Sequence, residues 1–556
     1  PTVAVLCILC MLVLAWTRNP PSAAAPAPPI AASTPSYVPP PESNLRGPDS
    51  SSSVPLSSSS SLVSEIEEET ARLKLELERL QTSIDEQTQA LAQATAAPTA
   101  PPPAPEAPSA PLVPFSEIPT YTGYTFWSSD FHISPIADLK DIFLPMGHSI
   151  IDKSLSGHCK LKDPPTCQID LRVLNTNDGL DMGIKNKGPN KGRACPNRMK
   201  REFFDSYKAD PEMVNVDAFL CNHAIGECEI FMGFGRPLVA IASTRYEIGR
   251  YNAPEWRAWN QNLRDIAANP RNVVAANNRY DAEYIKYFTG LKDVPVIPNF
   301  CGYTGVSYQP TRPEILIGPG RGISAKLEQE LQATAGRSSS GLTFKKIRDL
   351  YPHFEYSELA SHPAIVLIPY QVSLMSIFEY YRMDIPMFAP SPKLLADWQL
   401  KYRVMNELTW DLVFNQQTAK SNIEQFEGGS YPFDPNNQND AEAIAFWIKW
   451  ADFYEWPHIE TYDSWDELVE LVANADLART SALMKEENER MLVDLKETWG
   501  RNFHRMFEGV QPAKPGGGRG FEQTWDEGVK KHYEVTAGQC GMGDDVHDMD
   551  VSAVLI

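Results

Sequence analysis

Short apolar runs alternate with amphipathic segments along most of the chain after residue 115. The runs at 216–221, 237–243, 294–298 and 364–369 are rich in aliphatic side chains, and polar residues follow them. Such runs are typical of strands that are covered on both faces of a parallel sheet. Segments with helical spacing separate the runs. This alternation predicts an α/β fold with parallel sheets, whose ligands bind at the carboxyl ends of the strands.

The stretch 364–391 contains one complete unit of this pattern. Its apolar run leads into a polar turn, and a helix is predicted to begin near Ser373 and Ser376 and to end at 384–386, before a second strand. Backbone N–H groups at a helix start bind phosphate, and Glu379, one turn further along, leans back toward the same place. We therefore predict a pocket for an anion beside a sugar. The alternative is an ordinary buried βαβ unit in which Glu379 is solvated.

Polar residues also follow the predicted strands nearer the N-terminus. Asp130 and His132 follow the first of these strands, His223 follows a later one, and Arg245 and Glu247 follow another. Because the carboxyl ends of parallel strands share one edge of a sheet, we expect these side chains to face one cleft. Carboxylates and imidazoles are the usual proton-transfer groups of enzymes, so the first three are the catalytic candidates. A structural role for each residue is the alternative.

The chain after residue 391 is mostly helical and aromatic. An aromatic stripe at 444–456 is more typical of a core than of a sugar-binding platform. A long amphipathic helix is predicted at 483–507. The glycine-rich run 516–520 follows no predicted strand, so we interpret it as part of a flexible tail and not as a phosphate loop.

The first residues form an apolar segment and then a proline-rich one. Residues 3–16 are uncharged and strongly apolar, although this run is shorter than the ~20 residues that span a membrane as a helix. A signal anchor at 1–17 and a cleaved signal peptide both fit the pattern, and we favour the anchor because 18–61 has the composition of a stem. Proline, alanine and serine dominate that stem, which predicts disorder.

A heptad pattern follows the predicted stem. One heptad position holds Ile66, Leu73, Leu80 and Gln87, and the other holds Thr70, Leu77, Ile84 and Leu91. This pattern predicts a short coiled coil at 62–94 and therefore a homo-oligomer. A single amphipathic helix lying on the folded body is the alternative. A proline- and alanine-rich linker, 95–114, separates this segment from the folded body.

The charge balance limits the classes of partner. The chain has 50 basic and 71 acidic residues, a net charge of −21 and a sequence pI near 5.0. A protein that binds nucleic acid needs a basic excess to neutralise phosphates, so we expect no nucleic-acid partner. The 47 prolines crowd the first part of the chain, and the folded body after them is long enough for two α/β domains.

The nine cysteines do not have the spacing of a zinc site, so we predict no metal site. Disulfides between Cys159 and Cys167, or between Cys221 and Cys228, are possible if the body lies in the secretory lumen. For Cys221 we favour the alternative of a small buried hydrophobe, because it ends a strand-like run.

The stretch 364–391 resembles the nucleotide-sugar-binding segment of GT-B-fold glycosyltransferases. In that family a strand leads to a turn of small residues, a helix that carries a glutamate, and a hydrophobic residue after a proline. Glu379 stands at the place of the family's glutamate, and the resemblance implies that it binds the ribose of the nucleotide. Asp384 replaces the usual glycine, so the match is to a pattern. The corresponding pieces are Pro369, Ser373, Ser376 and 384–387.

Two further segments resemble this family. Residues 273–299 are similar to the exit from its N-terminal domain, and 310–313 to the connection between its two domains. The glycine-rich turn 318–326 follows the first predicted strand of the second domain. In retaining members of the family an arginine and a lysine at this spacing bind the diphosphate. The resemblance therefore implies a donor-binding set of Gly320, Arg321, Lys326, Ser373, Ser376 and Glu379.

The resemblance implies the architecture of the whole chain. We expect two Rossmann-like domains, an acceptor-side domain at 115–309 and a nucleotide-sugar-binding domain at 310–510. The helix 483–507 would cross back to the first domain, and 511–556 would be a flexible tail. The preceding anchor, stem and coiled coil resemble the stems of Golgi glycosyltransferases. They imply a single-pass type II protein of the Golgi or endoplasmic reticulum membrane with a luminal catalytic body.

We therefore expect a metal-independent glycosyltransferase that moves a sugar from a nucleotide-diphosphate sugar to a hydroxyl of a glycan or glycoconjugate. The nucleotide sugar is a substrate, and no cofactor is expected. Many retaining members of the family carry an acidic residue eight positions before the ribose-binding glutamate, but Gln371 occupies that position here. The choice between retention and inversion therefore stays open. An inactive sugar-binding scaffold protein and a nucleotide-sugar epimerase of the same fold are the alternatives.

Overall fold

The structure is a computed structural model that describes residues 115–130, 132–155, 167–168, 171–173, 196–248, 250, 253–319, 325–408 and 418–513. All of these lie in one compact unit, Ala110–Ile556. The predicted anchor, stem, coiled coil and first linker lie outside the described residues, as do 514–556 of the predicted tail. Among the helices of the described ranges, none is long and apolar enough to cross a membrane.

The first sheet has five strands, all parallel, in the order β2-β1-β3-β4-β5. Strand β3, with the sequence AFLC, is buried along its whole length. A strand covered on both faces has no solvent-facing positions, which explains its continuous apolar run. The strands are β1 Thr125–Ser128, β2 Ser149–Asp152, β3 Ala218–Cys221, β4 Leu238–Ala242 and β5 Val273–Ala276.

The second sheet is also parallel and has the order β10-β9-β8-β6-β7. Leu367 at the end of β8 pairs with Gly318 at the end of β6, so these two strands end side by side. The chain segments that follow them leave from the same edge of the sheet. The strands are β6 Ile315–Gly318, β7 Phe344–Lys346, β8 Ile365–Leu367, β9 Met387–Pro390 and β10 Ile459–Tyr462.

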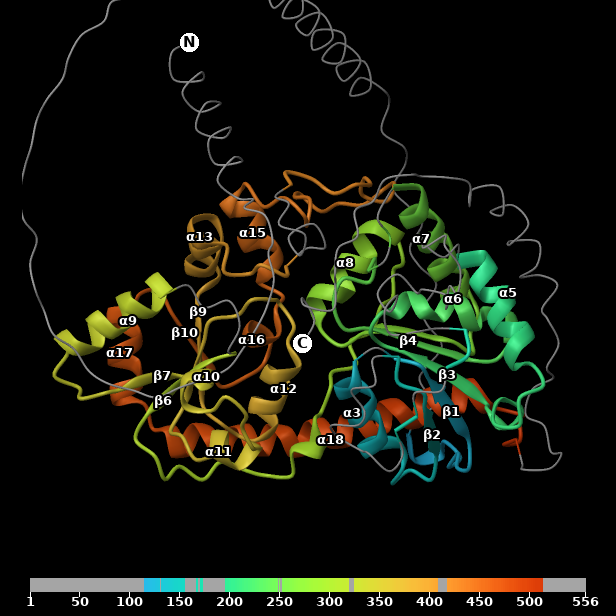
Figure 1. Cartoon of the computed structure of the whole chain (residues 1–556), viewed down its shortest axis with the longest axis horizontal. Coiled ribbons are helices and arrows are strands. Elements are labelled where there is room, and N and C mark those ends of the chain that lie inside the picture. Colours follow the sequence, from blue (N-terminus) through green and yellow to red (C-terminus); the bar gives the residue numbers. More distant parts are fainter. Residues whose placement is uncertain are drawn as a thin grey trace, which may run out of the picture. The chain divides into compact units, whose positions relative to one another are not determined.

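Helices flank the first sheet and connect its strands (Figure 1). Local signals fix some of their ends: the Asn278 side chain accepts a hydrogen bond from the Asp281 N–H at the start of α8, and Gly290, at φ 69°, ends that helix. The α-helices are α3 Ile133–Phe143, α5 Pro196–Tyr207, α6 Cys228–Phe231, α7 Ala253–Ala268 and α8 Arg279–Thr289. Single 3-10 turns are η1 Phe115–Glu117, η3 Met213–Asn215, η4 Ile225–Glu227, η5 Met232–Phe234 and η6 Gly302–Thr304.

A further set of helices surrounds the second sheet (Figure 1). Helix α13 begins at Pro392, and the preceding Ser391 side chain accepts from the Leu394 N–H. These helices are α9 Ala325–Arg337, α10 Ile347–Leu350, α11 Tyr356–Ala360, α12 Met375–Arg382, α13 Pro392–Tyr402, α15 Ala441–Ile448, α16 Asp452–Glu455 and α17 Trp465–Asn474.

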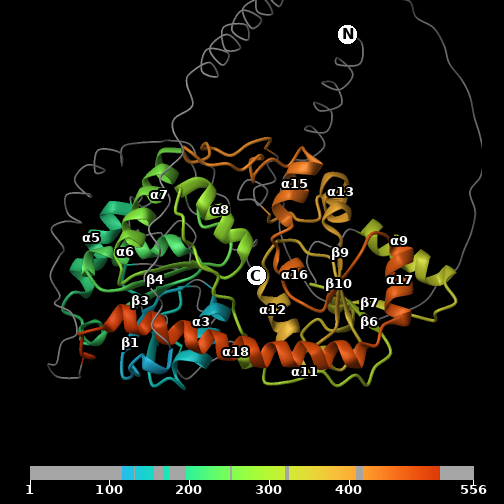
Figure 2. The same cartoon turned by 180° about the vertical axis from the view of Figure 1, so that it is seen from behind.

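Helix α18, Leu477–Phe507, runs from the second sheet's helices to the first sheet (Figures 1 and 2). In its first half, the Asn488 Nδ2 donates to the Tyr381 carbonyl and to Asp384 Oδ1, both at 2.8 Å. Near its end, Trp499 and Phe503 are fully buried in the core of the first sheet. The predicted crossing helix is thereby confirmed, although it begins earlier than 483. Two Rossmann-like domains joined by such a helix form the GT-B architecture.

The core confirms the structural interpretation of the aromatic stripe. Trp447 in α15 is 1% exposed and stacks on Tyr431, with ring centroids 5.4 Å apart. Phe453 in α16 is fully buried. These side chains fill space between helices, as large aromatic residues in a core do.

A disulfide joins Cys221 and Cys228. The favoured interpretation of Cys221 as a mere small hydrophobe is therefore wrong. Its side chain is buried at the end of β3, as predicted, but the short segment after β3 turns back and brings Cys228 within bonding distance. Cys167 is also disulfide-bonded, whereas Cys159 lies outside the described residues.

Candidate active site

The carboxyl end of the first sheet is organised around Asp130, which follows β1. Its Oδ2 accepts hydrogen bonds from the backbone N–H groups of Asn222 and His223, each at 2.8 Å, and its Oδ1 accepts from the His132 N–H at 2.9 Å. Asp130 is 2% exposed. The carboxyl group thus ties the end of β1 to the end of β3, and the structure brings the three predicted catalytic residues together.

Asp130 has an unusual protonation equilibrium for an aspartate. Burial raises its pKa to about 7, against the lowering effect of the three backbone hydrogen bonds. Desolvation disfavours the charged carboxylate, whereas the N–H donors favour it. Asp130 is therefore present in both protonation states near neutral pH, which is the property that general acid–base chemistry needs.

The two predicted histidines lie edge to face. The ring centroids of His132 and His223 are 5.5 Å apart, with an interplanar angle of 88°. Burial lowers the pKa of His223 well below its usual value, and the nearby His132 and Arg245 lower it further. His223 is therefore a neutral imidazole at physiological pH. A neutral imidazole is the form that accepts a proton, and the lowered pKa makes this one a weaker base than an exposed histidine.

Glu227 belongs to this cluster, although the sequence analysis missed it. It lies in η4, is fully buried, and its Oε2 accepts a hydrogen bond from the Ser129 hydroxyl at 3.3 Å. Burial and, secondly, the charge of Asp130 raise its pKa well above the usual value. Its Oε1 has no hydrogen-bond partner among the described residues. The signal that could have found Glu227 is its place between two cysteines directly after a strand.

Arg245 and Glu247 follow β4, at the same edge of the sheet. Arg245 has a φ of 41°, and its N–H donates to Asp281 Oδ1 at 3.2 Å. Its guanidinium donates to the carbonyl oxygen of Glu407. Glu247 accepts from the Tyr284 hydroxyl at 3.0 Å, and burial raises the pKa of Glu247 to about 7.

At the second sheet, the end of β6 lies against α12. A Cβ atom at Gly318 would lie 2.6 Å from Ile347 Cδ1 and 3.5 Å from the Tyr380 hydroxyl, so a larger residue there would force Ile347 to move. The N–H of Ile368, just after β8, donates to the Gly318 carbonyl at 2.7 Å. The turns after β6 and β8 therefore leave the sheet next to each other.

The structure describes four of the six predicted donor-binding residues. Gly320 and Arg321 lie outside the described residues. Lys326 is in the first turn of α9, and its Nζ lies over the Tyr402 ring, 5.5 Å from the centroid. Ser376 lies in the first turn of α12, beside the Tyr380 hydroxyl.

Ser373 lies in the turn between β8 and α12 and is 3% exposed. It is next to Asp452, at the start of α16, and burial raises the pKa of Asp452 well above its usual value. Desolvation of this kind favours the protonated form of the carboxyl group.

Glu379 lies in α12 and is 8% exposed. Its Oε1 accepts hydrogen bonds from the hydroxyls of Tyr303 and Tyr356, both at 2.7 Å. Tyr303 belongs to η6, which comes between the two sheets in the sequence. In this structure Glu379 thus joins α12 to the connecting segment, and its contact with a ribose stays a prediction.

Residues from the ends of both sheets meet at Glu407. Its carbonyl oxygen accepts from Arg245, which follows β4, and from the side-chain amide of Gln371, which follows β8. Nearby, the Tyr280 N–H donates to the Trp450 carbonyl at 3.2 Å. The carboxyl ends of the two sheets therefore face each other. Gln371 is the residue that departs from the acidic pattern of many retaining glycosyltransferases.

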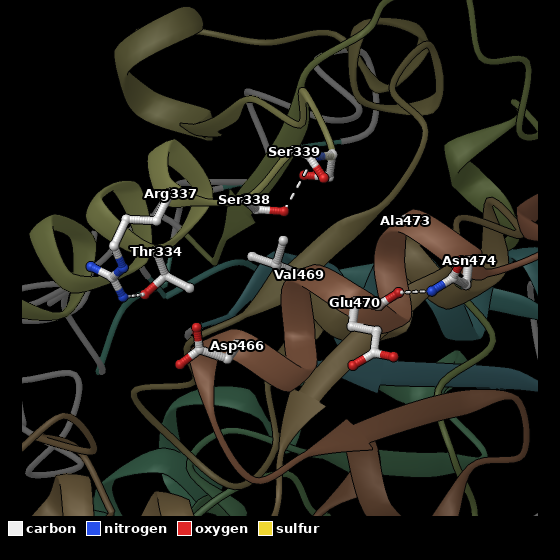
Figure 3. A pocket seen from close by; sticks show the side chains of 10 residues that line it. Thr334, Arg337, Ser338, Ser339, Asp466, Val469, Glu470, Ala473 and Asn474 are labelled. Atoms are coloured by element: carbon white, nitrogen blue, oxygen red, sulfur yellow. Dashed lines mark hydrogen bonds between the residues drawn. The ribbon is translucent and has the colours of Figure 1, made fainter.

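A surface pocket with a volume of about 410 Å³ lies elsewhere, between α9 and α17 (Figure 3). Arg337, Asp466 and Glu470 contribute charged groups to it, and Ser338 and Ser339 contribute hydroxyls. None of the predicted site residues lines this pocket. Among the described residues, no group of three or more His, Cys, Asp or Glu side chains has the geometry to hold a metal ion.

Comparison with known proteins gives a likeness of fold. No family model matches the sequence, and no curated protein is significantly similar to it. Among solved structures, the glycotransferase of kitacinnamycin is 12% identical, with a TM-score of 0.34, over 68% of this chain and 99% of that one.

Two further solved structures are similar over 68% of this chain. The glycosyltransferase SnogD from Streptomyces nogalater is 10% identical over 99% of its own length, with a TM-score of 0.32. The spinosyn rhamnosyltransferase SpnG is 10% identical over its whole length, with a TM-score of 0.30, and is also known in complex with thymidine diphosphate. Identities and TM-scores this low carry no argument about activity, so the functional argument depends on the residues of this chain.

Proposed function

We propose that the protein transfers a sugar from a nucleotide-diphosphate sugar to a hydroxyl of a glycan or glycoconjugate, without a metal. The observation that supports this proposal most is the meeting of Arg245 and Gln371 at the Glu407 carbonyl. Polar residues from the carboxyl ends of the two parallel sheets therefore bind the same carbonyl oxygen. Ligands of open α/β sheets bind at such ends, so a donor on one sheet would face an acceptor on the other.

The donor side must compensate the charge of the departing diphosphate. Backbone N–H groups at the start of α12, after Ser373, are suited to this role because a helix N-terminus attracts anions. Lys326 would add a positive charge from the neighbouring turn, and Gly320 and Arg321 are proposed to complete the set. Glu379 is proposed to hold the ribose, in exchange for its hydrogen bonds with tyrosines.

The acceptor side must take up a proton from the attacking hydroxyl if the anomeric configuration inverts. We assign this role to His223, whose neutral imidazole can accept the proton. The acceptor oxygen would bond to the anomeric carbon, the bond from that carbon to the diphosphate oxygen would break, and the proton would move to His223. Asp130 would position His223 through the backbone N–H, and His132 lies against its ring. Arg245 and Glu247 are proposed to contact the acceptor.

A role as a catalytically inactive sugar-binding or scaffold protein is the second candidate. One observation favours it: Glu379 already accepts hydrogen bonds from two tyrosines, and such a residue serves the fold without any nucleotide. The predicted coiled coil would then assemble partners. The two candidates differ in whether the sugar is transferred.

We also propose that the folded body lies in the lumen of the Golgi or endoplasmic reticulum, behind a single N-terminal membrane anchor and an oligomerising stem. The Cys221–Cys228 disulfide supports an oxidising compartment, because disulfides rarely persist in the cytosol.

Thermal shift with a panel of UDP- and GDP-sugars tests the proposal first, because a ligand that binds only the folded chain raises the melting temperature. We expect at least one nucleotide sugar to raise it, and Lys326→Ala to weaken that effect. Transfer or hydrolysis of the same donor then separates the enzyme from the scaffold. Absence of any shift across the panel would contradict the proposed transfer from these donors and would favour the scaffold candidate.

A further inference from the structure

The segment between Cys221 and Cys228 is closed by their disulfide. Cys221 ends β3 and Cys228 begins α6, and both side chains are fully buried. The sequence separation of the two cysteines is 7, so the bond closes a small ring of chain, which we call the 222–227 loop. This loop leaves the carboxyl end of the first sheet.

The 222–227 loop carries several of the groups that build the acceptor-side cluster. Its Asn222 and His223 N–H groups are two of the donors to Asp130, and its Glu227 carboxyl accepts from Ser129. Both partners, Ser129 and Asp130, lie just after β1. The loop is therefore bound to the neighbouring strand end near each of its own ends.

The conformation of the 222–227 loop has little support from its own backbone. Within it, the Glu227 N–H donates to the Ala224 carbonyl at 3.0 Å, in a single 3-10 turn. Such a short turn does not hold its shape alone. Contacts outside the loop add constraints: Ala224 and Ile225 are buried, the Ser243 hydroxyl donates to the Asn222 carbonyl at 3.3 Å, and a Cβ atom at Gly226 would lie 2.8 Å from Arg250 Nη2. A covalent bond between the two ends of a loop lowers the number of conformations that the loop can adopt.

We propose that the Cys221–Cys228 disulfide is a positioning device of the active site. It holds Glu227 against Ser129 and fixes the two N–H groups that donate to Asp130, so that sugar transfer requires the oxidised chain. This inference rests on the proposed glycosyl transfer. Glu227 is a positioning residue in it, because it acts on Asp130 and the loop and touches no substrate.

Glu227 fits this role as a neutral carboxylic acid. An ionised Glu227 next to an ionised Asp130 would repel it, and full burial of both groups gives no solvent to screen that repulsion. A glutamine has the same shape and no charge, so Glu227→Gln should keep the loop in place. Glu227→Ala removes the contact with Ser129 and leaves a cavity.

The state of the disulfide is tested first by alkylation of the unfolded wild-type chain without reductant, followed by mass spectrometry. The proposal expects Cys221 and Cys228 to be protected from the reagent. Alkylation of both thiols in protein prepared from an oxidising compartment would overturn it.

The positioning role is tested with the double variant Cys221→Ala/Cys228→Ala. Hydrogen exchange of peptides that cover 218–232 should become at least ~10-fold faster at the Asn222 and His223 amides, because the loop opens locally more often. The transfer rate kcat should fall about 10- to 100-fold, because misplaced catalytic groups lose much of their effect. The thermal shift with the donor should persist, since the donor-binding residues lie at the other sheet.

Matched variants separate positioning from a general loss of stability. Ile230→Ala removes a buried side chain from the same helix, α6, and should leave the Asn222 and His223 amides protected at temperatures where the chain is folded. Glu227→Gln should retain most of the transfer rate and its pH profile, whereas Glu227→Ala should lose transfer about as far as the double variant does.

The outcomes also separate this inference from the proposed function. Unchanged exchange at the two amides in the double variant would overturn the inference, whatever the activity. If the wild type transfers and the double variant transfers equally fast, the inference fails and the function stands. If the wild type neither binds nor transfers any donor, the proposed function fails. The claim that transfer requires the disulfide then fails with it.

Discussion

The carboxyl ends of the two sheets differ in the kinds of side chain that they carry. At the first sheet, Asp130, His223 and Glu227 are buried groups whose pKa values are moved far from their usual ranges. At the second, the turn after β8 leads into the start of α12, and Glu379 accepts hydrogen bonds from two tyrosine hydroxyls. The first edge is thus suited to moving protons and the second to holding an oxygen-rich ligand. A transferase needs both, on opposite sides of the reacting carbon.

The sharpest test of this comparison is the removal of the His223 imidazole. For His223→Ala we expect kcat for transfer to fall by about 10²- to 10⁴-fold, the usual range for loss of a general base. The thermal shift with the donor should be unchanged, because the second sheet is intact. Steady-state kinetics and thermal shift measure the two effects.

His148→Phe provides the control. His148 is another buried histidine of the same half of the chain, and it packs among aromatic rings such as Phe503, at 4.3 Å between centroids. Its replacement should leave transfer nearly unchanged. An equal loss of transfer in His148→Phe and His223→Ala would mean that the first edge is only structural.

The pH dependence of stability tests whether the pKa values of the buried acids are raised. Burial raises the pKa of Asp130, Asp138 and Glu247 to about 7 and that of Asp281 to about 6. Each acid binds its proton more tightly in the folded chain. Its stabilising contribution is therefore complete below the unfolded pKa, near 4, and is lost as the pH rises to the folded value.

Urea unfolding at a series of pH values measures this loss, and Asp138→Asn isolates one contribution. Asp138 accepts from the Asn299 amide at 2.9 Å and from the Phe300 and Cys301 N–H groups. The decrease in unfolding free energy between pH 4 and pH 7 should be shallower in Asp138→Asn, by up to about 1.4 kcal/mol for each pKa unit of the shift. Identical pH profiles would contradict a raised pKa at Asp138.

The role of Glu379 tests whether the second edge binds the nucleotide donor, in contrast to the first edge. In Glu379→Ala we expect the thermal shift with the donor to disappear, because the ribose would lose its proposed partner. We also expect the unfolding free energy to fall by about 1–3 kcal/mol, because the tyrosine hydroxyls lose their acceptor. Tyr303→Phe is the matched variant: it should lower stability by about 1 kcal/mol and keep the donor shift. A donor shift that survives in Glu379→Ala would assign this residue to the fold alone.

The smallest effect is expected for the contact between α18 and α12. Asn488→Ala removes two hydrogen bonds, to Tyr381 and Asp384, and should lower the unfolding free energy by about 1–2 kcal/mol. Chemical denaturation measures it. Transfer under folding conditions should change little, so a large loss of activity would show that the docking of α18 also controls the facing edges.

Much of the fold could be predicted from the sequence because its signals are local. The apolar run at 364–369 contains β8, and the break at 384–386 lies between α12 and β9. The alternation of such runs with helical segments led to the two parallel sheets. The start of α18 was missed because Asp476, which accepts from the Arg479 N–H, stands before the clearly amphipathic part.

The site could be predicted only where it lies at strand ends. The proximity of Asp130, His132 and His223 was predicted in that way, and their catalytic role stays a prediction. Glu227 was missed because its contact with Ser129 joins residues 98 positions apart, and the one local signal for it is its place between two cysteines. The shared partner of Arg245 and Gln371 was missed too, because Arg245 and Glu407 are 162 residues apart in the sequence. Contacts between residues so far apart in the sequence depend on how the two sheets pack against each other. The periodicity of the sequence carries no information about that packing.

The single helix α18 has a consequence for how a ligand would enter. It spans 31 residues without a break, is fastened to α12 through Asn488, and is buried at Trp499 against the first sheet. A straight helix resists bending, so separating the two edges requires either a twist about its axis or release of one of its attachments. The weaker of the two attachments would then set the rates of ligand binding and release.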